Sequence, residues 1–236
     1  MELSERQKEI LQSIIETYIR TAEPVSSKFL EKKYDFGICP ATIRIEMQKL
    51  TDDGFISQPH TSAGRVPTDR GYRFFVDNLL EKGFLNKDYN FEAEDLFEGE
   101  LTDTVKFIQA VTKNLASFSS NLALGYLADE KILWKEGWEE ILKEPEFREE
   151  KLVFDFTEMV KSLEKEIDDL QINSEVKVFI GRENPWSKAK EFSTIVTRCQ
   201  LPKKEEGILA IIGPKRMDYD KNIGSLDSLI KLLGKI

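Results

Sequence analysis

The sequence predicts an α+β protein that consists of two domains. Its 236 residues are enough for two domains of modest size, since a domain usually has about 100–200 residues. Apolar residues recur at helical spacing in the first 50 residues, whereas short β-like runs alternate with helices after residue 103. A stretch of acidic residues separates the two patterns. Hydrophobic residues at 40% and charged residues at 33% are typical of a soluble globular chain.

The first helix is predicted over residues 4–20. Ser4 and Gln7 have the spacing of a capping box, in which each side chain accepts a hydrogen bond from the backbone of the other residue. The apolar residues that follow at helical spacing are Ile10, Leu11, Ile14, Ile15 and Tyr18. Pro24 interrupts this pattern, and a short second segment begins at Val25 and closes at residues 33–37.

A third helix is predicted to begin at Pro40. Proline suits the first position of a helix because the N–H that it lacks would have no partner there. Ile43, Met47 and Leu50 form the apolar face of this helix, and Gly54 marks its end. Three short helices in about 50 residues indicate a helix-turn-helix.

A β-hairpin is predicted after the third helix. Residues 55–59 and 64–67 flank a small polar loop, and the prolines in both stretches suit the edges of a sheet. Thr68 can cap a fourth helix that continues to about residue 82. Three helices followed by a hairpin are the plan of a winged helix, so residues 1–82 are predicted to form a winged-helix DNA-binding domain.

Residues 83–102 are predicted to be an acidic linker, because they contain six acidic residues and one lysine. Residues 103–236 then form a mixed α and β regulatory domain. Its helices are expected from Val105 to Phe118, after a cap at Asp155, and from Leu226 to Leu233. Its strands are expected near residues 121–126, 176–180, 193–198 and 207–212.

Composition excludes several kinds of site. Cys39 and Cys199 lie far apart, so the sequence supports neither a disulfide framework nor a cysteine zinc site. His60 is the single histidine, which excludes most histidine-dependent catalysis and metal binding. The carboxylates of residues 136–170 are mixed with lysines, as on solvated helix faces. We therefore expect no catalytic residues, no metal and no cofactor.

Charge and hydropathy limit the partners. No run approaches the roughly 18 apolar residues that a membrane span needs, and the charged start does not suit a signal peptide, so we expect a cytoplasmic protein without a membrane partner. A net charge of −9 argues at first against a nucleic-acid partner. However, residues 1–82 hold 12 Lys and Arg against 13 Asp and Glu, net −1, whereas the remainder has net −8. The first domain can therefore present a local basic surface.

The third helix supplies the first candidate DNA-binding residues. Those that lie off its apolar face are Thr42, Arg44, Gln48 and Lys49. Arg44 can make a bidentate contact with guanine or hold a phosphate, and Gln48 can read adenine. Thr42, near the start of the helix, suits a phosphate contact. The alternative is that all four are ordinary solvated positions.

The hairpin and the helix after it supply the second group of candidates. They are His60, Thr61, Ser62, Arg65, Arg70 and Arg73. The three arginines lie near a single acidic residue, Asp69, among small residues that allow close approach to a phosphate chain. His60 alone is more typical of a hydrogen-bonding loop residue than of a ligand or a base.

The first 77 or so residues resemble the heat-inducible transcription repressor family (HrcA). The stretches that carry the resemblance are Pro40-Ala41-Thr42-Ile43-Arg44 with Glu46-Met47, and residues 58–73. The second domain is similar to the family at residues 145–147, 179–184 and 213–219. The resemblance implies a GAF-like C-terminal domain and a homodimer that represses chaperone operons by binding an inverted repeat in double-stranded operator DNA. It also implies that the chaperonin modulates this binding.

Two departures from the family pattern affect these expectations. The family has Ser before Pro40 and Asn after Arg44, whereas this chain has Cys39 and Ile45. Residues 124–138 also connect regions that a long inserted dimerisation segment separates in full-length relatives. We therefore expect a weaker dimer, joined through the apolar faces of residues 105–118 or 226–233 unless the domain core buries them. Two alternatives stay open: a winged-helix regulator that senses a small molecule, and a protein-interaction module that has lost operator reading.

Overall fold

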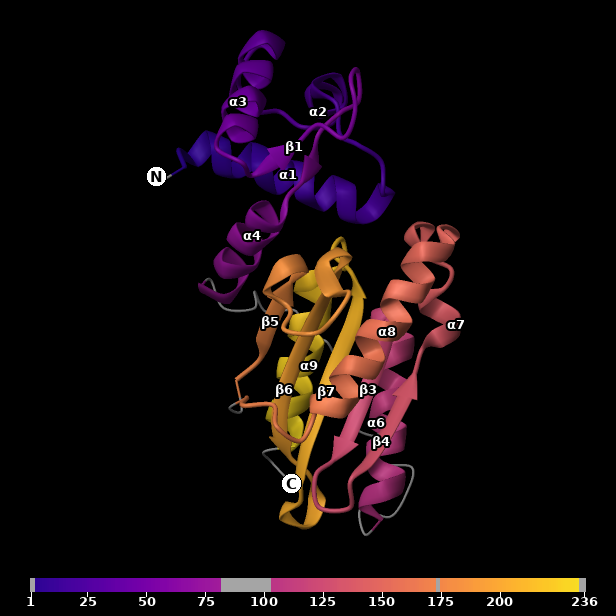
Figure 1. Ribbon diagram of the computed structural model, residues 1–236. Helices are drawn as coiled ribbons and strands as arrows, with labels where there is room; N and C mark the ends of the chain where they lie inside the picture. Colours follow the sequence, from indigo (N-terminus) through magenta and orange to yellow (C-terminus); the bar gives the residue numbers. More distant parts are fainter. Residues whose placement is uncertain (1–2, 82–102, 173–174, 234–236) are drawn as a thin grey trace. The chain divides into compact units, whose positions relative to one another are not determined.

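The computed structural model describes residues 3–81, 103–172 and 175–233. The chain divides into two compact units, Met1–Gly83 and Phe84–Ile236 (Figure 1). The stretch predicted as an acidic linker, residues 83–102, lies outside the described residues. The prediction of an α+β protein is confirmed, because the first unit is mainly helical and the second contains a five-stranded antiparallel sheet.

Residues 3–81 of the N-terminal unit form four helices and a two-stranded hairpin. In chain order they are α1 (Glu5–Thr21), α2 (Ser27–Lys33), α3 (Pro40–Asp52), β1 (Ile56–Ser57), β2 (Val66–Pro67) and α4 (Asp69–Glu81). The predicted capping box is present: Ser4 N donates to Gln7 Oε1 at 3.0 Å, and Gln7 N donates to Ser4 Oγ at 3.3 Å. Pro40 occupies the first turn of α3 as predicted.

The core of the N-terminal unit lies between α1, α3 and α4. The side chains that are at most 2% exposed there include Ile10, Leu11, Ile14, Ile15, Ile43, Leu50, Tyr72 and Val76. Thr68 joins the hairpin to α4: its Oγ1 accepts a hydrogen bond from Gly71 N at 3.2 Å and donates to Gly54 O at 2.7 Å. The predicted cap at Thr68 is therefore confirmed, and it fixes the position of the hairpin against the end of α3.

The C-terminal unit is built on one sheet with the strand order β4-β3-β7-β6-β5, in which every neighbouring pair is antiparallel. The strands are β3 (Leu122–Leu127), β4 (Ile132–Glu136), β5 (Lys177–Ile180), β6 (Phe192–Gln200) and β7 (Glu206–Pro214). The helices are α6 (Thr104–Ser119), α7 (Trp138–Ile141), α8 (Glu150–Glu166) and α9 (Tyr219–Leu233). Short 3-10 turns are η1 (Pro145–Arg148), η2 (Gly181–Glu183), η3 (Ala189–Glu191) and η4 (Pro202–Lys204).

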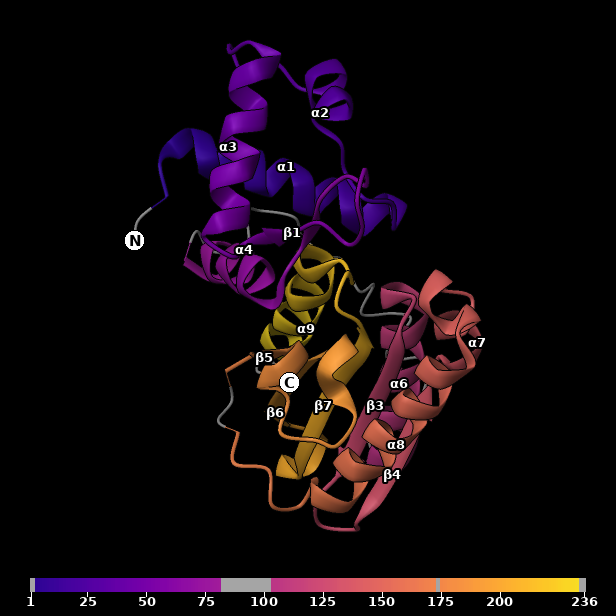
Figure 2. The ribbon, with the colours of Figure 1, turned by 45° about the horizontal axis from the view of Figure 1, so that its top comes forward.

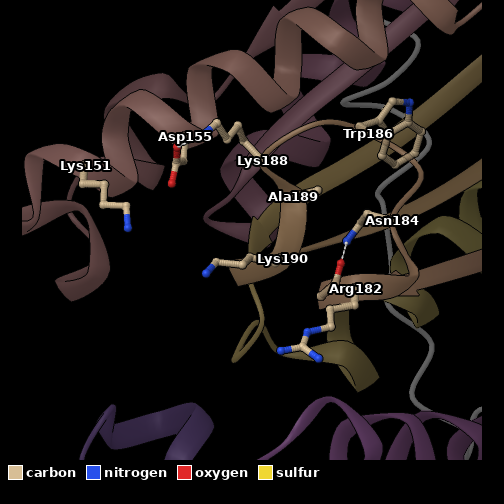
Figure 3. Close-up of a pocket in the computed structure, with 9 residues that line it drawn as sticks. Lys151, Asp155, Arg182, Asn184, Trp186, Lys188, Ala189 and Lys190 are labelled. Carbon is tan, nitrogen blue, oxygen red and sulfur yellow. Dashed lines mark hydrogen bonds and ion pairs between the residues drawn. The ribbon is translucent and has the colours of Figure 1, made fainter.

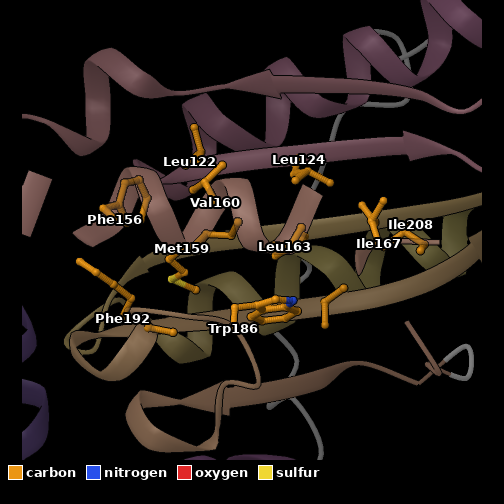
Figure 4. Close-up of a cluster of buried hydrophobic side chains, with 14 of the residues drawn as sticks. Leu122, Leu124, Phe156, Met159, Val160, Leu163, Ile167, Trp186, Phe192 and Ile208 are labelled. Atoms are coloured by element: carbon orange, nitrogen blue, oxygen red, sulfur yellow. The ribbon is translucent and has the colours of Figure 1, made fainter. Parts of the chain in front are cut away.

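Helices cover both faces of this sheet. Figures 1 and 2 show α8 on one face and α6 with α9 on the other. Alternate residues of each strand point to opposite faces, so one side of the sheet packs on α8. Figure 4 shows that side of the core, where Phe156, Met159 and Leu163 of α8 lie against Leu124 and other strand residues. On the opposite face Gly125 leaves room for α6, because a Cβ there would lie 2.1 Å from Thr112 Oγ1.

Three expectations for the C-terminal unit are wrong or incomplete. Asp155 does not cap a helix: α8 begins at Glu150, and Asp155 is a buried residue within it. The short strand β4 was not predicted. The apolar faces of α6 and α9, considered as dimer surfaces, are turned into the core of this unit, where Ile108, Val111 and Leu229 are completely buried.

Candidate nucleic-acid interface

One side of α3 packs in the N-terminal unit and the other side is exposed. The buried residues are Ile43, Glu46, Met47 and Leu50. Arg44, Gln48 and Lys49 are exposed, as predicted from their position off the apolar face, and Thr42 is half-buried. Ile45 lies among them with 54% of its surface exposed, and it gives this side of α3 an apolar position.

The start of α3 is held by Cys39 and Thr42. Cys39 Sγ and Thr42 Oγ1 lie 3.2 Å apart, and Thr42 N donates to Cys39 O at 2.9 Å. Cys39 stands at the N-cap but makes no side-chain cap to the backbone of the helix. The hydrogen bond with the Thr42 side chain lowers the pKa of the exposed Cys39 thiol below its ordinary value.

The hairpin is attached to the segment that precedes α2. Val25 and Arg65 form an isolated antiparallel bridge, and Gln58 Nε2 donates to Ala63 O at 3.1 Å across the loop. Gly64 lies so close to that segment that a Cβ would come within 2.5 Å of Pro24 O. Glycine is therefore required at this position for the hairpin to reach its place.

A cleft of about 300 Å³ separates α3 from the hairpin loop and the start of α2. Four of the predicted DNA-binding residues line it: Arg44, Gln48, Ser62 and Arg65. Arg44 Nε donates to Ser27 Oγ at 3.3 Å, and Arg65 Nε donates to Thr51 Oγ1 at 3.1 Å. The fold thus brings two arginines from distant parts of the sequence to a single concave surface, where their charges can act together on an anionic partner.

Ser26 and Ser27 also line this cleft, although the sequence pattern did not indicate them as binding residues. Ser26 caps α2, accepting a hydrogen bond from Phe29 N at 3.1 Å, and this cap was the available sequence signal. The position of Ser27 beside Arg44 follows from tertiary packing, which the sequence pattern does not reveal.

The other predicted residues do not line the cleft. Arg70 Nη1 donates to Asp53 O at 2.6 Å, and its guanidinium lies 4.4 Å from the Phe55 ring centre. Arg73 forms an ion pair with Asp77 at 3.3 Å, and Lys49 forms one with Glu46 at 3.1 Å. Thr42 belongs to the start of α3, and Thr61 and His60 belong to the exposed hairpin loop.

Residues 3–81, 103–172 and 175–233 contain no group of three or more His, Cys, Asp or Glu side chains that could hold a metal ion. None of the helices within those ranges is long and apolar enough to cross a membrane.

Comparison with known proteins gives extensive matches. A curated protein of Thermoanaerobacter pseudethanolicus, named heat-inducible transcription repressor HrcA, is 28% identical over 336 aligned positions that cover 100% of this chain and 97% of the relative. Since the chain has 236 residues, at least 100 of those positions contain no residue from it, as expected for a short form. A protein of the same name from Desulfitobacterium hafniense is 47% identical over 122 residues, 52% of this chain and 34% of the relative.

A solved crystal structure of a hypothetical protein has the same fold. It matches with a TM-score of 0.85 at 20% identity and covers 99% of this chain and 98% of its own. The family model described as the HrcA protein C terminal domain matches residues 73–223. The match includes more than half of the sequence, and the chain belongs to the HrcA family.

Proposed function

We propose that this protein is a transcriptional repressor that binds double-stranded operator DNA through residues 1–82. In this proposal the N-terminal unit is a winged helix, in which α3 enters the major groove and the β1–β2 hairpin is the wing. The observation that carries the proposal is the cleft that brings Arg44 and Gln48 of α3 together with Ser62 and Arg65 of the hairpin. The name of the relatives, heat-inducible transcription repressor, supports the same function.

The contacts divide into base reading and backbone binding. Arg44 and Gln48 are exposed on α3, and their side chains carry the donors and acceptors that read guanine and adenine. Arg65 is half-buried beside Thr51, which suits a fixed phosphate contact better than base reading. Ser62 is proposed as a phosphate contact in the cleft and Thr42 as one at the start of α3. The other candidates lie outside the cleft and are proposed only as peripheral contacts with DNA: Lys49, His60, Thr61, Arg70 and Arg73.

The remaining parts of the chain have regulatory roles in this proposal. Residues 83–102 are a linker, and residues 103–236 form a GAF-like regulatory domain. The protein acts as a homodimer on an inverted repeat in front of chaperone operons, with the chaperonin as a modulating partner. Occupation of the operator excludes the polymerase, so repression needs no catalytic residue.

A DNA-binding experiment tests this function. Purified protein is used for footprinting across its own genome, and each protected site is then compared with a scrambled sequence in a competition assay. The expected result is protection of inverted repeats upstream of chaperone genes and a specific affinity at least about 1000-fold above that for scrambled DNA. Equal competition by scrambled DNA would refute operator binding and favour the interaction module.

Ile45 is the observation that favours that second candidate. It is 54% exposed on α3 directly after Arg44, where the family pattern has a polar residue. An apolar contact with a thymine methyl group would reconcile Ile45 with DNA reading. Replacement by Asn therefore distinguishes the two functions, because Ile45→Asn should change operator preference in a DNA reader and should leave DNA binding absent in an interaction module.

A further inference from the structure

The C-terminal unit contains a hollow of about 420 Å³ with cationic walls. It lies between the first half of α8 and the turns η2 and η3 (Figure 3). Four cationic residues line it: Lys151, Arg182, Lys188 and Lys190. The one acidic residue in its lining is Asp155. This excess of positive charge stands out because residues 83–236 together have a net charge of −8.

The cations are positioned by three separate elements. Lys151 lies in the first turn of α8, Arg182 on η2, and Lys190 on η3, which Lys188 directly precedes. Figure 3 shows the Lys151, Arg182 and Lys190 side chains extending toward the same open side of the hollow. All four residues are exposed, so their charged ends are accessible to a ligand from solution.

The protein's own acids satisfy these lysines only weakly. Lys188 Nζ is 3.7 Å from Asp155 Oδ1, and Lys190 Nζ is 3.9 Å from Glu191 Oε1. Both distances exceed the roughly 2.7–2.9 Å of a strong charge-assisted hydrogen bond. Lys151 has no ion-pair partner among the described residues. A ligand can therefore recruit these amines without breaking tight contacts.

The floor of the hollow is rigid and partly apolar. Trp186 and Ala189 are each 3% exposed, and Asn184 is fixed by hydrogen bonds from its Nδ2 to Gly181 O and Phe192 O, both at 2.9 Å. A volume of about 420 Å³ is within the range of about 300–1,000 Å³ that small-molecule sites occupy. A concave site of this size suits a small molecule better than a duplex, which needs an extended surface.

We propose that this hollow binds a small organic polyanion whose charge resides on phosphate or carboxylate oxygens. Lys151, Arg182 and Lys190 hold the anionic groups, Lys188 is shared with Asp155, and the apolar floor supports the carbon skeleton. The residues of this site belong to a different unit from the DNA-binding cleft. The proposal therefore does not depend on whether the N-terminal unit binds DNA.

Calorimetric titration of the full chain at constant ionic strength tests the proposal. The probes are pyrophosphate for the phosphate class and tricarballylate for the carboxylate class. The test variant is Lys151→Gln/Lys190→Gln. The matched control is Lys113→Gln/Lys161→Gln, which removes the same charge from two exposed lysines that do not line the hollow. Thermal unfolding verifies that each variant is folded, and Lys151→Gln alone replaces the double variant if that one is unfolded.

The expected result is saturable binding of at least one probe with one site per chain. The affinity should fall about tenfold or more in the test variant and stay within about twofold of wild type in the control. Whichever probe binds more tightly identifies the class of ligand. No saturable binding of either probe, or an equal loss in the test and control variants, would overturn the proposal. Binding of a random duplex that depends on Lys151 and Lys190, with neither small probe bound, would assign the cluster to nucleic acid instead.

Discussion

Val25 and Arg65 exchange two main-chain hydrogen bonds, from Val25 N to Arg65 O at 2.9 Å and from Arg65 N to Val25 O at 2.8 Å. The Arg65 side chain continues from this bridge to α3, where its Nε donates to Thr51 Oγ1. The start of α2, the hairpin and α3 are thereby connected. The position of Arg65 relative to Arg44 depends on these three hydrogen bonds.

Gly64→Ala should displace the hairpin from this position. The added Cβ would lie 2.5 Å from Pro24 O and 2.6 Å from Val25 C, and backbone atoms cannot move aside as a flexible side chain can. We expect the free energy of unfolding to fall by about 1–3 kcal/mol, the usual cost of overpacking. Urea denaturation measures the change, and operator binding should weaken in parallel.

Gly37→Ala is the control for this variant. A Cβ at Gly37 meets no atom within 4 Å, but the residue has a φ of +63°, so alanine there costs about 1 kcal/mol through backbone strain alone. If Gly64→Ala destabilises the protein no more than Gly37→Ala does, the close approach of the hairpin to Pro24 is not a constraint.

Arg44→Ala and Arg65→Ala should weaken operator binding in different ways. Loss of a base contact at Arg44 should cost about 1–3 kcal/mol mainly on the cognate site. Loss of a phosphate contact at Arg65 should weaken all sequences similarly and reduce the slope of log affinity against log salt by about 1. Fluorescence anisotropy with cognate and scrambled duplexes at several salt concentrations separates the two effects.

Two further variants control for charge and for structural damage. Arg65→Lys keeps the charge and should keep the salt slope, although it loses the Nε–H that donates to Thr51 Oγ1. Lys8→Ala removes a cation of α1 that does not line the cleft, and it should leave binding within about twofold of wild type. Unchanged binding in both the Arg44 and Arg65 variants would remove the basis for the proposed interface.

Cys39 should be the thiol that reacts in the folded protein. It is exposed and the Thr42 hydrogen bond lowers its pKa, whereas burial raises the pKa of Cys199 to about 12. A thiolate is the reactive form, so a thiol reagent should label Cys39 first and Cys199 only after unfolding. Mass spectrometry identifies the labelled residue.

The labelling of Cys39 also tests whether DNA covers the start of α3. Cys39 stands at the N-terminus of α3, so bound operator should slow its labelling by about tenfold or more under saturating DNA. Cys39→Ser is the control, because it should abolish the fast reaction. Equal rates of labelling with and without operator would show that DNA does not cover the start of α3.

The sequence predicts local features of the fold well and long-range features poorly. The Ser4–Gln7 capping box and the start of α3 at Pro40 depend on a few neighbouring residues, and both are present. The predicted cap at Asp155 is wrong because the helix pattern extends N-terminally to Glu150, and the carboxylate instead lies near Lys188. The strand β4 is short and half-buried at an edge of the sheet, so its hydrophobic pattern is weak.

In the candidate site too, local features follow from the sequence and long-range contacts do not. Residue type and helical spacing were enough to select Arg44 and Gln48 as exposed positions of α3. The composition of the hairpin also favoured Arg70, yet this arginine bonds to Asp53 O and lies over the Phe55 ring. Proximity in the sequence did not reveal that contact, because it depends on how the hairpin returns to α3.

Tyr126→Phe should make stability less sensitive to pH at both extremes. Burial, and then the hydrogen bond to Asp168, raises the pKa of Tyr126 to about 12. The folded state thus keeps the phenol proton that the unfolded state loses near pH 10. The stabilisation that the Tyr126 hydroxyl gives to the folded state is therefore lost as the pH rises from about 10 to about 12. The same hydrogen bond lowers the pKa of Asp168. The stabilisation that the Asp168 carboxylate gives to the folded state is therefore lost as the pH falls through and below the ordinary pKa of 3.8.

Unfolding midpoints of wild type and Tyr126→Phe across pH measure both contributions. The variant lacks the phenol, so the difference between the two proteins should be greatest in the neutral range and should shrink above pH 10 and in acid. Lys131 also pairs with Asp168, at 3.5 Å, so Lys131→Gln should change the acid limb and leave the alkaline limb intact. Parallel profiles for all three proteins would show that the Tyr126–Asp168 contact does not couple to titration.

The described residues of the C-terminal unit leave little exposed apolar surface for a dimer interface. An inverted-repeat operator requires two protomers, since one winged helix reads only a few base pairs. The apolar faces of α6 and α9 are used inside their own unit, where Ile108, Val111, Leu226 and Leu229 are completely buried. Among the described residues of the C-terminal unit, the large apolar side chains that remain exposed are Leu142 at 47% and Phe154 at 60%. Two side chains provide far less apolar area than a stable dimer interface of roughly 1,200–2,000 Å².

We therefore predict that the free protein is a weak dimer and that DNA assembles the two protomers. Binding should then depend steeply on protein concentration, because each operator must capture two chains that are mostly separate in solution. Sedimentation of the free protein and of the operator complex measures both states. Phe154→Lys should weaken any self-association further if Phe154 lies at the contact, whereas Phe29→Lys on the N-terminal unit should not. A tight dimer at nanomolar concentration without DNA would contradict the weak-dimer prediction, and one protomer per operator would contradict two-fold binding itself.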